Sequence, residues 1–187
     1  MKWRLGVGVA LLAGVVAVAS IDLSLAVQRW DELGPVPPGE PMPALSFATL
    51  EGEALDTAAL RGRVTVLTFW TTWCPACRSE LADVDALARE FEGEDVAFVA
   101  VNLEGGQMPL PRARELVANY RDEHALTVPL AIDGGAAARA LRIGPIPHTV
   151  VLDAAGAIRR VHQGRVLSRT LRADIERLQT TAATDSR

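Results

Sequence analysis

The only two cysteines of this 187-residue chain lie two residues apart, in the run Cys74-Pro75-Ala76-Cys77. A bridge across so short a loop constrains the unfolded chain little, which argues against a purely structural disulfide. A zinc site needs four ligands, and beyond this pair the chain has only three widely spaced histidines. Two thiols at this spacing suit thiol-disulfide exchange, in which one attacks a partner and the other releases it. The sequence therefore predicts a redox-active pair.

A buried strand and a helix are predicted on the two sides of the pair. The preceding run, 64–70, is mostly β-branched and aromatic, which is the composition of a strand buried on both faces. After the pair, apolar residues recur at helical spacing, and Gly93 offers a C-terminal stop. These apolar residues are Leu81, Val84, Leu87, Ala88 and Phe91. The pair is therefore expected at the point where a helix begins.

This position predicts different tasks for the two thiols. Pro75 suits the first turn of a helix, which makes Cys74 the N-cap, facing unpaired backbone N–H groups. Such a position favours the thiolate, so Cys74 is the expected nucleophile. Cys77 lies on the apolar face of the predicted helix and is expected to be the resolving thiol.

Glu80 is the third candidate catalytic residue. At 100° per residue it borders the apolar helix face, where desolvation raises the pKa of a carboxyl group. Glu80 is therefore a candidate proton acceptor for Cys77. The alternative is a surface glutamate whose charged end reaches solvent.

The first 28 residues are predicted to be a signal anchor or a signal peptide. A short basic start precedes 17 residues without a charge, Leu5 to Ile21, and apolar residues continue to Val27. An uncleaved inner-membrane anchor is the preferred interpretation, and cleavage after Ala19 is the alternative. Both place the cysteines outside the cytoplasm, on the periplasmic side. The net charge of −4 disfavours binding to nucleic acid.

Three further segments follow this N-terminal stretch. Residues 29–43 are predicted to be a Pro-rich linker, because 34–43 holds five prolines. Residues 44–180 form the expected domain, and 181–187 a loose tail. Within the domain, a hairpin is predicted at 45–55, strands at 96–101, 128–132, 149–153 and 157–162, and helices at 111–120, 136–141 and 167–178. A strand-helix-strand order around the cysteines predicts a parallel pair with a right-handed crossover.

These motifs together resemble the thioredoxin superfamily. They are a buried strand ending in Trp-Cys-x-x-Cys, a helix, a second parallel strand, and Ile146-Pro147 before a closing hairpin and a final helix. The Phe-Trp-x-x-Trp-Cys-Pro-x-Cys-x-x-Glu run and the exported N-terminus are similar to the TlpA/ResA type of membrane-anchored thiol-disulfide oxidoreductase. The resemblance implies an α/β, thioredoxin-like fold: a central mixed sheet, flanking helices and an extra N-terminal hairpin.

The resemblance also implies residue roles. Pro147 matches the cis-proline beside the cysteine pair, and Ile146 before it would offer backbone hydrogen bonds to a substrate chain. Trp73 and Pro75 are expected to contribute to the same substrate-binding surface. The implied activity is reduction of protein disulfides in cytochrome c or copper-site maturation, with a membrane thiol-disulfide donor. The Cys74–Cys77 disulfide would be the only redox group.

Two other functions remain open from the sequence. A soft-metal chaperone would hold copper(I) with Cys74, Cys77 and His148. A thiol peroxidase would use Thr71, which stands three residues before Cys74 as in peroxiredoxins.

Overall fold

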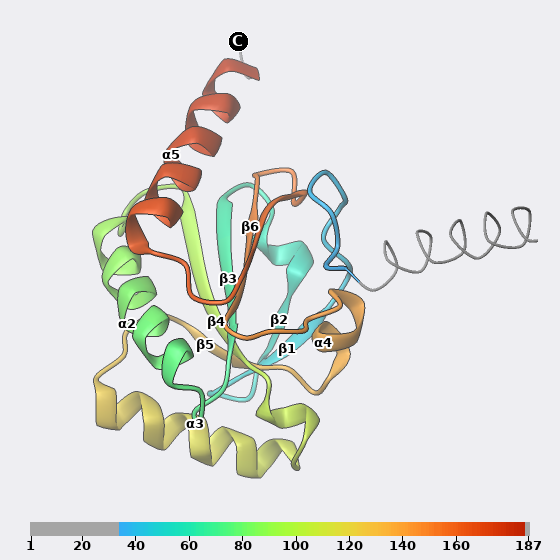
Figure 1. The fold of residues 1–187 in the computed structure, drawn as a ribbon, viewed down its shortest axis with the longest axis vertical. Helices are drawn as coiled ribbons and strands as arrows, with labels where there is room; N and C mark the ends of the chain where they lie inside the picture. Colours follow the sequence, from blue (N-terminus) through green and yellow to red (C-terminus); the bar gives the residue numbers. More distant parts are fainter. Residues whose placement is uncertain (1–33, 186–187) are drawn as a thin grey trace, which may run out of the picture. The chain divides into compact units, whose positions relative to one another are not determined.

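A computed structural model describes residues 34–185 of the chain. In this part, seven strands form one mixed sheet, with four α-helices and two 3-10 turns around it (Figure 1). The strands are β1 (Ser46–Thr49), β2 (Ala54–Asp56), β3 (Val64–Trp70), β4 (Val96–Asn102), β5 (Leu130–Ile132), β6 (His148–Leu152) and β7 (Ile158–Gln163). The helices are α2 (Pro75–Glu90), α3 (Leu110–His124), α4 (Ala136–Ala140) and α5 (Ser168–Asp185), and the 3-10 turns are η1 (Thr57–Leu60) and η2 (Glu104–Gly106). The α/β fold expected from the sequence is confirmed.

The cysteine pair follows the central region of the sheet. The strand order is β2-β1-β5-β4-β3-β6-β7, and every residue of β3 is buried. β3 pairs in parallel with β4 and antiparallel with β6. The predicted parallel strand-helix-strand unit and the closing hairpin of β6 and β7 are therefore present. The hairpin of β1 and β2 adds to the sheet through β5.

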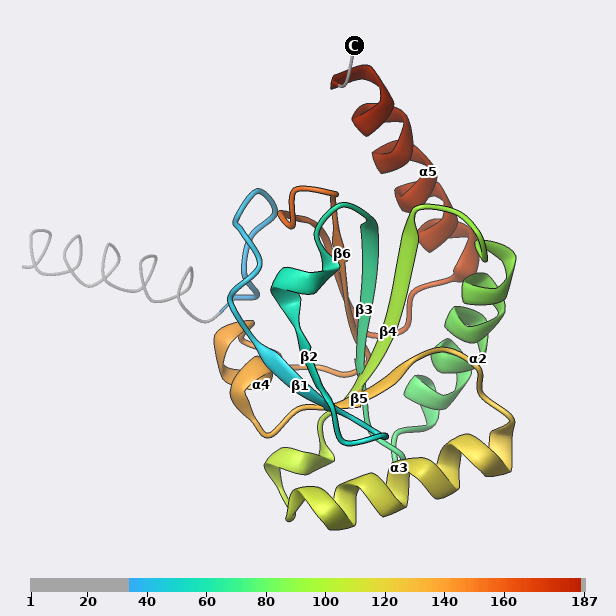
Figure 2. The same cartoon turned by 180° about the vertical axis from the view of Figure 1, so that it is seen from behind.

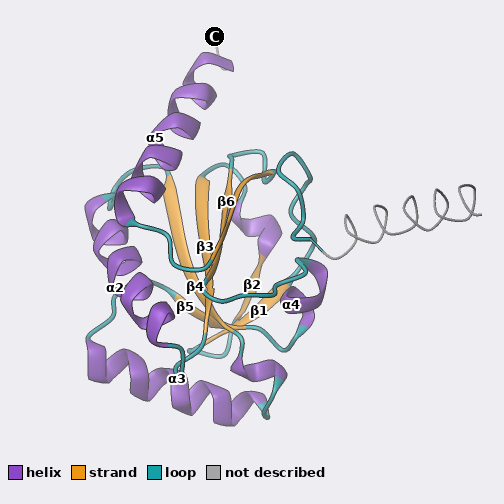
Figure 3. Ribbon diagram, in the orientation of Figure 1, coloured by secondary structure: helices purple, strands orange, loops and turns teal. Residues whose placement is uncertain are grey.

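Helices cover both faces of the sheet (Figures 2 and 3). Buried side chains of α2, α3 and α5 share one core cluster with Trp70 and the two cysteines. The second cluster joins Phe69 on the opposite face of β3 to η1 and α4. Phe69 and Trp70 belong to different clusters, which shows why the run 64–70 is buried throughout: both of its faces are covered.

The described part of the predicted linker is packed against the domain. The compact unit that contains the domain begins at Pro35. Backbone bonds join Gly39 N to Ile158 O and Ile158 N to Glu40 O, and Met42 N donates to Gly156 O. Val36 and Met42 pack against the second core cluster. Residues 35–43 are therefore not a free spacer, because their backbone pairs with the β6–β7 turn.

The C-terminal helix is longer than the apolar spacing predicted. α5 continues through Asp185, whereas the sequence predicted a tail from residue 181. The last turns lie beyond Leu178, the last residue of the apolar spacing in the sequence, so that periodicity could not reveal them. The signal anchor predicted for 1–28 lies outside the described residues. Within 34–185, no helix combines the length and apolar character that crossing a bilayer requires.

Candidate active site

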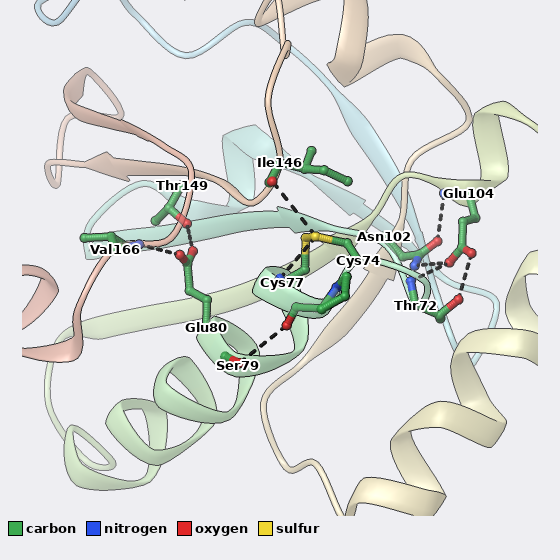
Figure 4. The surroundings of a disulfide bond; sticks show 11 residues. Thr72, Cys74, Cys77, Ser79, Glu80, Asn102, Glu104, Ile146, Thr149 and Val166 are labelled. Carbon is green, nitrogen blue, oxygen red and sulfur yellow. Dashed lines mark hydrogen bonds between the residues drawn. A yellow bond between two sulfur atoms is a disulfide. The ribbon is translucent and has the colours of Figure 1, made fainter.

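Cys74 and Cys77 form a disulfide at the start of α2 (Figure 4). Their Cα atoms are 5.2 Å apart. Cys74 is the N-cap of α2, in an extended conformation, and Pro75 occupies the first turn. The Cys77 N–H donates to Cys74 Sγ over 3.2 Å, so the sulfur meets a backbone donor that has no partner within the helix. The position predicted for Cys74 is the one observed.

The two cysteines differ in their access to solvent. Cys74 is 6% exposed and Cys77 is fully buried. Trp73, immediately before them, is the most exposed large hydrophobic residue in the part of the chain that the structure describes, at 63%. Of the two sulfur-bearing residues, only Cys74 reaches the surface, and an exposed indole stands beside it.

The loop before β6 brings a cis-proline to the disulfide. The peptide bond Ile146–Pro147 is cis, and Pro147 is buried. The Ile146 carbonyl oxygen lies 3.9 Å from Cys74 Sγ. This approach across 72 residues follows from the antiparallel pairing of β3 and β6, in which the end of β3 lies beside the start of β6.

Glu80 is more buried than its place on the helix predicted. Its side chain is not at the border of the core but inside it, with no exposed area. Oε1 accepts a hydrogen bond from Thr149 Oγ1 at 2.6 Å, and Oε2 accepts one from the Val166 N–H at 2.7 Å. Burial raises the pKa of the Glu80 carboxyl, and these two hydrogen bonds partly oppose the rise. Neither partner was predicted, since Thr149 and Val166 come from β6 and from the segment before α5.

A second buried carboxylate lies on the other side of the pair, at Glu104 in η2 (Figure 4). It accepts hydrogen bonds from the backbone and hydroxyl of Thr72, at 3.1 and 2.8 Å. It also accepts one from Asn102 Nδ2, at 2.8 Å. Sequence reasoning did not single out Glu104. The available signal was an acidic residue two positions after the end of a buried strand.

The ligand set of the copper alternative is not assembled. The ring of His148 lies against Phe69 of the second core cluster, whereas both cysteines belong to the first cluster. Burial lowers the pKa of His148 to about 4, so its ring is neutral at pH 7. Among residues 34–185, no three His, Cys, Asp or Glu side chains gather where they could hold a metal ion.

Comparison with known proteins agrees with this geometry. The Redoxin family model matches residues 37–177. The chain belongs to the Redoxin family. Its relatives include the thioredoxin-like protein YneN of Bacillus subtilis, 27% identical over 175 residues, which cover 94% of this chain and 97% of YneN. The thiol-disulfide oxidoreductase ResA of Halalkalibacterium halodurans is 32% identical over 116 residues, 62% of either chain.

Solved structures of other proteins have the same fold as this Redoxin chain. StoA from Bacillus subtilis superimposes with a TM-score of 0.59 at 27% identity, over 72% of this chain and 96% of StoA. A DsbF homologue from Corynebacterium diphtheriae shares the fold, with a TM-score of 0.63 at 22% identity, over 78% and 92% of the two chains. The family, the relatives and the Cys74–Cys77 disulfide together identify a thiol-disulfide oxidoreductase with a thioredoxin-like fold.

Proposed function

We propose that this oxidoreductase reduces disulfides of other proteins outside the cytoplasm, with Cys74 as the attacking thiol and Cys77 as the resolving thiol. The observation on which this depends is the hydrogen bond from the Cys77 N–H to Cys74 Sγ at the start of α2. A thiolate formed on Cys74 would be stabilised there by the donors of the first helical turn.

The reaction needs two sulfur transfers. In the reduced protein, the Cys74 thiolate attacks one sulfur of a substrate disulfide, and the other substrate sulfur leaves as a thiolate. Cys77 then loses its proton and attacks Cys74 Sγ, which frees the second substrate thiolate. The substrate gains two electrons, and the Cys74–Cys77 disulfide is the oxidised product. A dithiol donor must then reduce this disulfide for another cycle.

Glu80 is the proposed acceptor of the Cys77 proton. It lies one helical turn after Cys77, and both side chains are fully buried. Burial raises the pKa of this carboxyl, which makes its ionised form a stronger base than an ordinary glutamate. The hydrogen bonds from Thr149 and Val166 hold the carboxylate in one orientation.

The substrate chain is proposed to lie across four residues around Cys74. Trp73 and Pro75 are exposed on either side of it. Ile146 is partly buried, precedes the cis bond to Pro147 and contributes its carbonyl oxygen near Cys74 Sγ. An extended chain could hydrogen-bond to this backbone while its disulfide meets Cys74.

The cellular setting is proposed from the N-terminus. The uncharged run from Leu5 to Ile21 would export the chain and retain it in the inner membrane, with the domain on the periplasmic side. A membrane thiol-disulfide donor would then recharge the pair. The resemblance to ResA-type proteins supports cysteines of apocytochrome c or of copper sites as substrates.

Trapping tests the assignment of the two thiols. Cys77→Ser should accumulate mixed disulfides with substrate proteins, because resolution is blocked, and Cys74→Ser is the matched control that should trap nothing. Trapping through Cys77 instead of Cys74 would overturn the assignment.

The reduction potential of the Cys74–Cys77 pair tests whether the protein reduces or oxidises its substrates. A reductant should have a potential near or below about −270 mV, whereas a value near about −120 mV would identify an oxidant.

A further inference from the structure

Glu104 makes its hydrogen bonds to the short turn that ends at Cys74. This turn comprises residues 71–74, and the Cys74 N–H closes it by donating to Thr71 O at 3.4 Å. Thr72 lies at its centre, and Glu104 accepts both the N–H and the hydroxyl of Thr72. One carboxylate therefore restrains backbone and side chain two residues before the sulfur that the proposed reaction uses.

Both the carboxylate and the backbone of Glu104 are also fixed to the sheet. Asn102, the last residue of β4, donates to Glu104 Oε2 through its side-chain amide and accepts the Glu104 N–H over 2.9 Å. The neighbouring Leu103 N–H donates to Trp70 O at the end of β3. Glu104 is thus held by the carboxyl ends of two adjacent parallel strands. Its carboxylate has little freedom to move with the turn.

Among the described residues, the two other side chains of the turn before Cys74, those of Thr71 and Trp73, supply no hydrogen bond that would hold it. Thr71 Oγ1 is buried and has no hydrogen-bond partner in the described part of the chain. Trp73 is largely in solvent. Glu104 is 3% exposed, so water competes little for its hydrogen bonds with Thr72.

We propose that Glu104 is a positioning residue: by holding Thr72 it fixes the turn that presents Trp73 and directs Cys74 Sγ toward a substrate disulfide. The role rests on the function proposed above. Thiol-disulfide exchange requires the attacking sulfur to align with the two substrate sulfurs. A mobile turn would hold Cys74 in this alignment less often, which would lower the rate of exchange. Glu104 itself touches neither the substrate nor the reacting atoms.

Substitutions of Glu104 can separate the effect of its hydrogen bonds from the effect of its charge. In Glu104→Gln, the amide oxygen can replace Oε2 and accept from Thr72 N–H and Asn102, while the amide NH2 donates to the Thr72 hydroxyl, which can also accept. Every contact is then kept without the charge. Glu104→Ala removes all three acceptor contacts. Thr72→Val removes only the hydroxyl contact and should give a smaller effect that is not additive with Glu104→Ala.

Asp85 provides a matched control. It is also a buried carboxylate, 4% exposed, that accepts a backbone N–H and a hydroxyl from one threonine, Thr127, at 2.7 and 3.0 Å. It also accepts the Val128 N–H and pairs with Arg89. The loop that Asp85 holds precedes β5 and contains neither cysteine. Asp85→Ala removes these contacts just as Glu104→Ala removes those of Glu104, and it should affect stability without affecting the reactivity of Cys74.

The deciding experiment measures Cys74 in two reactions, per folded molecule and at a pH where the thiol is fully ionised. In a Cys77→Ser background, a small neutral alkylating agent should react roughly threefold faster or more when Glu104→Ala is added, because a loosened turn exposes Cys74 beyond its 6%. In the parent chain, the rate of reducing a protein disulfide should fall about tenfold in Glu104→Ala, because alignment is lost. Glu104→Gln and Asp85→Ala should match their parents in both reactions.

Three results would overturn the role of Glu104. They are an unchanged alkylation rate in Glu104→Ala, an equal rise in Glu104→Gln, which would indicate charge, and an equal rise in Asp85→Ala, which would indicate general loosening. A parent chain that fails to reduce protein disulfides would refute the proposed function instead. In that case the alkylation rates would still decide whether Glu104 positions Cys74.

Discussion

At the scale of single residues, the site depends on how far each ionisable group is removed from water. Glu80 has no exposed area, and its raised pKa follows from that burial. His148 is also buried, and burial lowers its pKa to about 4. Desolvation thus favours the neutral form of both side chains, the acid in one and the free base in the other. Only the acid lies one turn from Cys77, on the cysteine side of the sheet.

Glu80→Gln should change both stability and exchange with pH. Because the folded state holds the Glu80 proton more tightly than the unfolded state, stability from this group is complete below its ordinary pKa of 4.5. That contribution is lost as the pH rises from 4.5 through the raised pKa. Measured by denaturant unfolding of the oxidised protein, the variant should therefore gain stability relative to the parent over this window.

The same variant tests the proton-transfer role. The resolution step should slow in Glu80→Gln, and the limb of its pH profile that reflects Glu80 should disappear. The oxidised protein is used for the stability measurement so that no thiol titrates. An exchange profile identical to the parent's would show that Cys77 passes its proton elsewhere.

At the scale of elements, η2 packs closely against the end of β5. A Cβ added to Gly105 would come within 2.6 Å of Ile132 Cγ2 and 2.7 Å of Asp133 O. The Asp133 N–H also donates to Asn102 O, which ties the end of β4 to the end of β5. At Gly105, η2 therefore lies too close to the end of β5 for any side chain to fit.

Gly105→Ala should destabilise the fold and displace η2. Since backbone must shift to relieve the contact with Asp133 O, the expected loss in the free energy of unfolding is about 1–3 kcal/mol. Gly134→Ala is the matched control, because a Cβ there meets nothing within 4 Å. Urea unfolding of both variants measures the difference, and equal stabilities would contradict the packing argument.

At the scale of the whole molecule, the segment before β1 belongs to the folded domain. Residues 39–42 pair with the turn between β6 and β7, at the end of the sheet opposite to Cys74. The strand β3 separates the two, because its first residues lie near Leu152 and its last near His148. The contacts of residues 39–42 and the redox-active pair thus lie at opposite ends of the sheet.

A truncation series should separate stability from redox chemistry. A chain starting at Ala44 loses the backbone bonds of Gly39 and Met42 and the packing of Val36, so its free energy of unfolding should fall by about 2 kcal/mol. A chain starting at Pro35 is the control and should keep the domain's full stability. Both should retain the same reduction potential. A shift in potential with the shorter chain would show that the two ends are coupled.

Local pattern was sufficient for the elements and for the cysteine pair. Three features involve neighbours in sequence: the mostly β-branched and aromatic run 64–70, the Cys-Pro-x-Cys spacing and the helical periodicity after it. The observed strand and helix follow them. These features predict well because strand and helix formation depend on side chains one to four residues apart. The cis bond at Pro147 was expected only from the resemblance, since a Gly-Pro-Ile-Pro loop has no spacing that specifies it.

Tertiary structure decided which distant groups meet the sulfurs. Glu80 accepts hydrogen bonds from Thr149 and Val166, which are 69 and 86 residues away in sequence. Glu104 accepts one from Thr72, 32 residues away. Strand order and register bring these residues together, and neither follows from the composition of any one strand. The helix face of Glu80 could be calculated from its position in the chain. Its complete burial could not, because that depends on β6 and on the segment before α5 closing over it.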